Sequence, residues 1–425
     1  MPDRKKQPAI KTINNFKVKK AEKQIISGSP VYILNAGDQD IIKTDFIFEA
    51  GKIYDKNPLI ALSVNSLIDK GTNNLTSEQI AEKLDFYGAY YETEITKHHS
   101  IITLYTLNKY FEETFNIVSD FLFNAIFPEN EINIYLKNRL QTFKINRQKT
   151  DVRSWEAFNE LLFGKEHPYG RNLKENDFTN TDRSKIIEFY RQNYTTANMT
   201  ILISGKVNDK HLKLTEKFLG AVEKGNKKKN KIKVVTEVKA GEKKRKFVKI
   251  EDTVQYSVKI GNLSINKTHP DFFNLKISTI ILGGYFGSRL MSNIREDKGY
   301  TYGIYAGIFS APGAGYFFIS AESGKEVYRK AVDEIYKELK ILRTIPVKND
   351  ELDRVKKWIY GNAAKTFDGP LATSEACKML ITGKLSENYF LNYIEAVKKI
   401  NAETILETAQ KYLNENSMIE VVAGA

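Results

Sequence analysis

Two polar side chains in the second half of the chain, Arg295 and Tyr302, have a chemistry and spacing that suit work on carbonyl groups. A guanidinium and a phenol are both hydrogen-bond donors, and two donors held at a fixed spacing can converge on carbonyl oxygens. Shortly before them, an apolar run ends in Gly283 and Gly284. These glycines are expected to let the backbone turn tightly or approach an extended peptide closely.

A short helix and a strand are expected to position the two donors. Leu290 and Ile294 fall on one side of a helical pattern, and Lys298-Gly299 suits the C-terminal end of that helix. Residue types then alternate, which predicts a strand over Tyr300–Phe309. The arginine would lie late in the helix and Tyr302 on the strand that follows.

This segment resembles the C-terminal half of the pitrilysin/insulinase family of zinc metallopeptidases, in the branch that includes the mitochondrial processing peptidase. The residues that carry the resemblance are Leu282-Gly283-Gly284, Ser288-Arg289-Leu290, Ile294-Arg295-Glu296, Lys298-Gly299 and Tyr302. The resemblance implies that Arg295 holds a substrate carbonyl and that Tyr302 stabilises the oxyanion of the tetrahedral intermediate. Taken alone, the two residues also fit a solvated helix arginine and a core tyrosine.

The metal motif of that family is not present in this chain. In the family, H-x-x-E-H lies on the first long helix, where two histidines one turn apart ligate Zn²⁺ and the glutamate activates the bound water. Counting back from Gly71-Thr72, these positions hold Leu62, Asn65 and Ser66, on a helix expected over Asn57–Ile68. Both histidines and the base are therefore replaced.

No other residues are expected to restore a zinc site. The family's third ligand is a glutamate on a later helix, and residues 132–150 contain no acidic side chain. His98 and His99 are adjacent in an expected strand and would point to opposite faces. The other three histidines, His167, His211 and His269, have no partner at ligand spacing. We expect no cofactor in this chain.

The order of the expected elements repeats once along the chain. A period of about 200 residues is too long for a solenoid, and it indicates two homologous domains. The resemblance implies the same architecture: an α+β fold of two duplicated α/β domains of the pitrilysin type, each a mainly antiparallel sheet packed by helices. We place the domains at 1–223 and 246–425, joined by a lysine-rich linker at 224–245.

Composition narrows the remaining classes of protein. The chain has 425 residues, a formal net charge of +13 and a single cysteine, Cys377, which fits a reducing cytoplasm. No apolar window is long enough for a membrane span, and the basic N-terminus has no apolar core of a secretory signal. Much of the positive charge lies in the expected linker, so binding to nucleic acid ranks last among the hypotheses.

The main hypothesis is that the chain is the non-metal subunit of a heterodimeric zinc metallopeptidase. Its partner would be a homologue that carries H-x-x-E-H and the zinc, and Arg295 and Tyr302 would act on peptide substrate at the partner's zinc site, beside Gly283 and Gly284. The chain alone would not be a peptidase. The alternative is a catalytically silent scaffold or peptide-binding homologue with no role in proteolysis.

Overall fold

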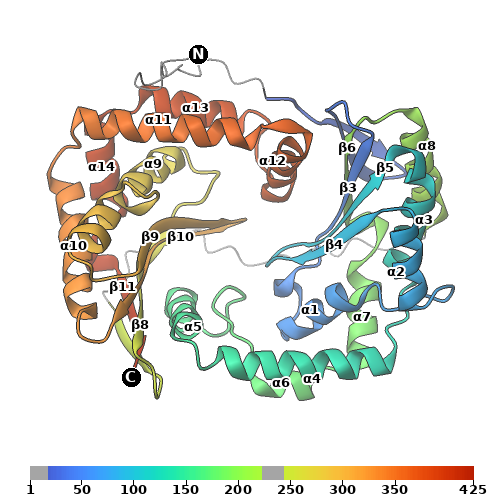
Figure 1. Cartoon of the computed structure of the whole chain (residues 1–425), viewed down its shortest axis with the longest axis horizontal. Coiled ribbons are helices and arrows are strands. Elements are labelled where there is room, and N and C mark those ends of the chain that lie inside the picture. Colours follow the sequence, from blue (N-terminus) through green and yellow to red (C-terminus); the bar gives the residue numbers. More distant parts are fainter. Residues whose placement is uncertain (1–17, 223–243) are drawn as a thin grey trace, which may run out of the picture.

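Two sheets with the same strand order lie at opposite ends of the longest axis of the molecule (Figure 1). The computed structural model describes residues 18–222 and 244–425. The strands of the first sheet are β1 (Glu22–Ile26), β2 (Ser29–Asn35), β3 (Ile41–Phe48), β4 (Tyr90–Ile95), β5 (Ser100–Leu107) and β6 (Met199–Gly205). Those of the second sheet are β7 (Lys244–Lys249), β8 (Gln255–Ser264), β9 (Gly303–Ala311), β10 (Ala314–Gly324) and β11 (Ile419–Gly424).

Strand pairing confirms the predicted internal duplication. The first sheet has the order β1-β2-β6-β3-β5-β4 and the second has the order β7-β11-β8-β10-β9. In each sheet one pair is parallel, β2 with β6 and β7 with β11, and the other pairs are antiparallel. Apart from the additional β1, the two sheets are therefore the same mixed arrangement, and the α+β prediction is confirmed.

The helices follow a similar order in both halves, except that a π-helix over Met291–Asp297 stands where the first half has a second α-helix and that the first half has an additional last helix. The first half contains α1 (Pro58–Leu67), α2 (Ser77–Phe86), α3 (Phe111–Asn124), α4 (Glu129–Asn146), α5 (Thr150–Phe163), α6 (Glu175–Thr179), α7 (Arg183–Asn193) and α8 (Asp209–Ala221). The second half contains α9 (Phe272–Gly283), α10 (Tyr328–Thr344), α11 (Asn349–Thr366), α12 (Gly369–Gly383), α13 (Tyr389–Lys399) and α14 (Ala402–Tyr412). Helices α4 and α11 run along opposite edges of the molecule (Figure 1). No described helix is both long and apolar enough to cross a membrane.

Local sequence signals account for the ends of several helices. Asn57 begins α1, where its side chain accepts a hydrogen bond from the Leu59 N–H at 3.0 Å. Thr76 and Gln79 form a capping box at the start of α2. Short-range hydrogen bonds of this kind depend only on residues near in sequence, so they could be predicted.

Each sheet is covered partly by a helix from the other half of the chain. Helix α5 packs on β8 and β11, whereas α12 packs on β6 and β3. The two helices occupy equivalent places in the duplicated order, so the exchange is reciprocal. The domain boundaries remain a prediction, and residues 224–243 of the expected linker lie outside the described residues. The last two residues of that linker, Lys244 and Arg245, are the first two of β7.

A fully buried lysine fixes each exchanged helix to the sheet that it covers. Lys43 on β3 lies 2.6 Å from a carboxylate oxygen of Asp45 and reaches Ser374 and Glu375 of α12 at 3.1 and 2.8 Å. Lys259, on the equivalent strand β8, lies 2.7 Å from Asp151 of α5.

Serine pairs stand beside both lysines. Ser204 of β6 donates to Ser374 at 2.8 Å, and Ser154 of α5 lies 2.9 Å from Ser257 of β8. The same chemistry therefore joins helix to sheet at both places, and each buried ammonium group has the carboxylate and hydroxyl partners that a buried charge requires.

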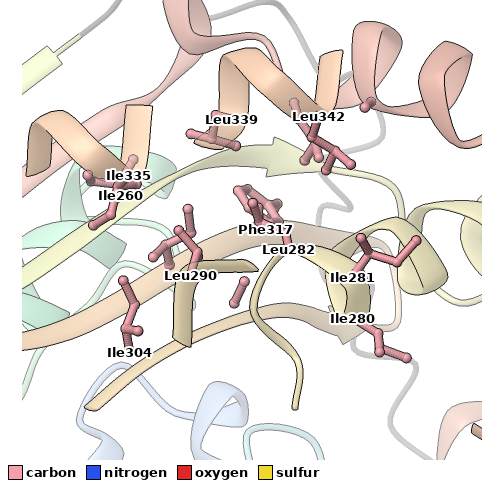
Figure 2. Close-up of a cluster of buried hydrophobic side chains, with 14 of the residues drawn as sticks. Ile260, Ile280, Ile281, Leu282, Leu290, Ile304, Phe317, Ile335, Leu339 and Leu342 are labelled. Carbon is pink, nitrogen blue, oxygen red and sulfur yellow. The ribbon is translucent and has the colours of Figure 1, made fainter. Parts of the chain in front are cut away.

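The core of the second half supports the segment around Arg295. Figure 2 shows apolar side chains of α9, α10 and the second sheet meeting, among them Ile260, Leu282 and Phe317. Leu290 and Ile294 are fully buried in the same cluster. Their burial holds the polypeptide between α9 and β9 against the sheet.

Three local expectations are corrected. The helix before Tyr302 is a π-helix over Met291–Asp297, in which the Lys298 N–H bonds the Asn293 carbonyl five residues back. Strand β9 begins at Gly303, so Tyr302 precedes it, because Thr301 is buried and bonds the Gly303 and Glu322 carbonyls in an irregular turn.

The third correction concerns His98 and His99. They lie in the connection between β4 and β5 and not in a strand, so strand alternation does not set the directions of their side chains.

Substitution Lys43→Met is expected to destabilise the fold by about 3 kcal/mol, because it removes one partner of a buried ion pair and leaves Asp45 buried. The midpoint of urea unfolding, followed by circular dichroism, measures the loss. Lys206→Met is the matched control, because Lys206 pairs with Asp40 at the surface and should change stability by less than about 1 kcal/mol. Equal midpoints for the two variants would contradict the role given to Lys43.

Candidate functional site

Ion pairs and hydrogen bonds to neighbouring helices hold the segment that carries Arg295 and Tyr302. Arg289 forms a bidentate ion pair with Glu351 of α11, in which Nε and Nη2 lie 2.8 and 2.9 Å from the two carboxylate oxygens. Asn293 donates to Glu338 of α10 at 2.7 Å, and Lys298 lies 3.0 Å from Glu334 of the same helix. Pairing of this kind orients the π-helix, and π-helical turns are frequent at functional sites.

The structure brings Arg295 and Tyr302 together at the surface. Nε of Arg295 donates to the backbone carbonyl of Tyr302 at 3.1 Å, and the Tyr302 N–H bonds the Glu322 carbonyl on β10 at 3.1 Å. The Tyr302 side chain is 81% exposed, which excludes the core-tyrosine interpretation. The Arg295 guanidinium lies 5.4 Å from the centre of the exposed Phe286 ring. Two hydrogen-bond donors and an apolar ring therefore share one exposed surface.

Gly283 and Gly284 both have structural roles at the C-terminal end of α9. Gly283 is buried, and a Cβ added there would lie 2.7 Å from the Cβ of Ala306 on β9, so only glycine lets α9 approach the strand this closely. Gly284 ends α9, and its N–H bonds the Ile280 carbonyl. Contact of either glycine with substrate stays a prediction.

The positions of the metal motif lie on α1, but their side chains do not suit zinc. Leu62 has no donor atom. The Asn65 amide donates to Ser100 of β5 at 2.7 Å and is buried in this structural hydrogen bond, and Tyr194 donates to the same hydroxyl at 2.6 Å. Ser66 is half-buried on the same helix. The side chains at these three positions therefore do not form a ligand set for Zn²⁺.

Helices α1 and α4, which in the family would carry the H-x-x-E-H motif and the third zinc ligand, face one cavity in this chain. A cavity of about 390 Å³ is bounded by Leu62 of α1 and by side chains of α4, including Arg139 and Phe143. The position of the first histidine and the helix of the third ligand are thus brought together by the fold. The cavity is lined by several cations, which the sequence analysis did not single out.

The sequence does indicate that α4 contributes positive charge to this cavity. Residues 132–150 carry lysines and arginines without a single acid, and this pattern served only to exclude a zinc ligand. The other cations of the cavity, Lys52, Lys97 and Arg171, come from a 3-10 helix and two loops, so their meeting with α4 depends on tertiary structure.

The histidines have structural partners. His98 and His99 are both buried, and burial is the main reason that the pKa of each falls to about 4. Nε2 of His98 lies 2.5 Å from the Tyr169 hydroxyl, and Nδ1 of His211 caps α8 by accepting from the Asn208 N–H. Within residues 18–222 and 244–425, no group of three or more His, Cys, Asp or Glu side chains is placed to hold a metal ion.

Comparisons with known families and proteins find relatives that are similar in sequence to this chain. Residues 180–358 match the family model described as the Peptidase M16 inactive domain. The chain is 24% identical over 419 residues to an uncharacterized zinc protease of Rickettsia felis, covering 93% of this chain and 95% of that protein. It is 22% identical over 367 residues to a non-peptidase homolog, YmxG, of Helicobacter pylori, covering 85% and 81% respectively.

Solved structures share the fold over nearly the whole chain. The peptidase M16 inactive domain from Pseudomonas fluorescens aligns with a TM-score of 0.87 at 20% identity, covering 95% of this chain and 98% of that one. A protease from Helicobacter pylori aligns with a TM-score of 0.87 at 15% identity, covering 96% and 100%. Together with the family model and the curated relatives, these matches confirm the resemblance drawn from the sequence. The chain is therefore a homologue of the M16 peptidases, the pitrilysin family.

Proposed function

We propose that this chain is the non-metal subunit of a heterodimeric zinc metallopeptidase. Its partner is a homologous chain that carries H-x-x-E-H and holds the zinc. Arg295 binds a carbonyl of the peptide substrate, and Tyr302 donates its hydroxyl to the oxyanion that forms when water attacks the scissile bond. Both residues act at the partner's zinc site.

One observation carries this proposal: half-buried Arg295 holds the backbone of exposed Tyr302, in a chain whose own motif positions are filled by Leu62, Asn65 and Ser66. Holding an arginine beside an 81% exposed tyrosine contributes little to the core. The pair is available to a molecule outside this chain.

The edge of the second sheet offers a place for the substrate. Strand β9 pairs with β10 along one side, and no strand of the described chain pairs with its other side. Tyr302 directly precedes β9, so a peptide added to this edge as a further strand would pass the tyrosine. Binding of this kind reads backbone groups more than side chains, and it fits a peptidase that accepts extended substrates.

The cytoplasm is the compartment that we expect for this pair, because the single cysteine, Cys377, offers no disulfide within the chain. No role in binding nucleic acid or a membrane is part of the proposal.

A second candidate function is a catalytically silent scaffold or peptide-binding homologue. The Helicobacter pylori relative that is described as a non-peptidase homolog favours it. In this case Arg295 and Tyr302 contribute to no peptidase activity, and substitution of either leaves proteolysis in the cell unchanged.

Substitution Tyr302→Phe is expected to lower kcat of the assembled heterodimer by about 100-fold or more, because it removes one hydrogen-bond donor to the oxyanion and nothing else. Assembly should be unchanged, since the exposed hydroxyl makes no hydrogen bond among the described residues. Steady-state kinetics on a peptide substrate give the value.

Tyr305→Phe is the matched control, because Tyr305 is an exposed tyrosine on β9, three residues further along, and its loss of a hydroxyl should leave kcat unchanged. Equal kcat for the Tyr302→Phe variant and the unmodified heterodimer would disprove the oxyanion role.

The triple substitution Leu62→His, Asn65→Glu and Ser66→His is expected to yield no peptidase activity in the chain alone. The substitutions restore the H-x-x-E-H sequence, but α4 carries no acidic third ligand after Glu131. They also remove the hydrogen bond from Asn65 to Ser100. Zinc content and peptide hydrolysis of the purified variant test this. A zinc-dependent peptidase from these three changes would refute the alignment of α1 with the motif.

A further inference from the structure

The cavity between α1 and α4 is positively charged. Its lining includes five cationic side chains and one carboxylate: Lys52, Lys97, Arg139, Arg147, Arg171 and Glu156. They come from the short 3-10 helix Lys52–Tyr54, the β4–β5 connection, α4 and its C-terminal end, α5, and the loop after α5. Residues far apart in sequence therefore converge on one place, opposite Leu62.

The single carboxylate does not neutralise this charge. Glu156 is already shared by Arg147 at 3.3 Å and by Arg153 at 3.4 Å. Arg171 is held in place by backbone carbonyls, including that of Asp55 at 2.8 Å, and these are not anions.

The other three cations, Lys52, Lys97 and Arg139, have no carboxylate within 4.0 Å among the residues that the structure describes. Burial lowers the pKa of Lys52, and the neighbouring charge of Arg139 lowers it further. Burial and Lys52 together lower the pKa of Lys97 to about 8. Cations that are partly removed from water and placed beside one another are stabilised by a bound anion.

Apolar side chains form much of the remaining wall of the cavity, together with the neutral polar residues Thr142, Asn146 and Asn172. Leu62, Phe143 and Val152 line it together with Ile53 and Pro58. The volume of about 390 Å³ lies within the range of small-ligand sites, about 300–1,000 Å³. Cations beside an apolar wall suit an organic acid whose carboxylate is attached to a hydrocarbon group, whereas an inorganic anion would leave that wall unused.

We propose that this cavity binds the C-terminal residue of a peptide, with its carboxylate on Lys52, Lys97 and Arg139 and its side chain against Leu62 and Phe143. Of the three motif positions, Leu62 lines this cavity, and Asn65 and Ser66 do not. The inference goes beyond the role of Arg295 and Tyr302, and it concerns this chain without its partner.

The test is calorimetric titration of the isolated full chain with acetyl-Ala-Ala-Leu bearing a free carboxylate, with the same peptide as its C-terminal amide, and with inorganic phosphate. The free acid is expected to bind, and amidation should weaken binding by about tenfold or more, because it removes hydrogen bonds to a charged group. Equal binding of acid and amide, binding of phosphate as tightly as the acid, or no binding of the acid would each overturn the proposal.

Variants on and off the cavity localise the binding. Lys52→Gln and Arg139→Gln should each weaken binding of the free acid by about tenfold. Lys137→Gln is the matched control, because Lys137 is exposed on α4 and does not line the cavity. Neither cavity variant should lower the unfolding temperature, since each removes one of several cations that repel one another. Wild-type affinity in both cavity variants would refute the assignment.

The affinity should also depend on pH. A bound carboxylate favours charged Lys97 and raises its pKa from about 8, so binding takes up protons and weakens as the pH rises from 7 to 9. The groups around Lys97 are Lys52, the Tyr169 ring at 5.5 Å, and His98, whose pKa of about 4 keeps it neutral in this range. Affinity that is constant from pH 7 to 9 would remove Lys97 from the site. Because no partner or zinc is present, these results are independent of the heterodimer proposal.

Discussion

The architecture depends on two buried lysines that fix exchanged helices to sheets. Lys43 and Lys259 lie on equivalent strands, and each is paired with a carboxylate on a helix from the opposite half of the chain. Burying an ammonium group is unfavourable unless its partners are in place, so each pair is satisfied only when α12 or α5 is correctly docked. These interactions join the two halves, and α5, which one of them docks, also contributes Val152 and Glu156 to the cationic cavity.

The two halves share one duplicated fold, but each carries a different candidate site. In the first half, the helix that would hold zinc contributes Leu62 to an apolar and cationic cavity, and its Asn65 is used in a structural hydrogen bond. In the second half, buried Leu290 and Ile294 and the ion pair of Arg289 hold a π-helix that presents Arg295 beside exposed Tyr302. The second half thus places Arg295 and Tyr302 at the surface, and no group of three or more His, Cys, Asp or Glu side chains within residues 18–222 and 244–425 is placed to hold a metal ion.

The sequence was sufficient for features that depend on neighbouring residues, such as the helix expected over Asn57–Ile68, which the structure shows as α1. It was also sufficient for the family, because the segment around Arg295 carries many matching residues at fixed spacing. It could not predict the exchange of α5 and α12, the irregular turn at Thr301 or the cationic cavity. Those features arise from contacts between residues far apart in sequence or, at Thr301, from side-chain hydrogen bonds to backbone carbonyls, and no local pattern records either.

The most direct test of the central claim is to isolate the tagged chain from its source cells, identify what accompanies it by mass spectrometry, and measure zinc in the eluate. The account predicts a roughly equimolar homologue that carries H-x-x-E-H, with about one zinc ion per pair. A zinc-free eluate that contains this chain alone, or only unrelated proteins, would contradict the split-enzyme account and favour the scaffold.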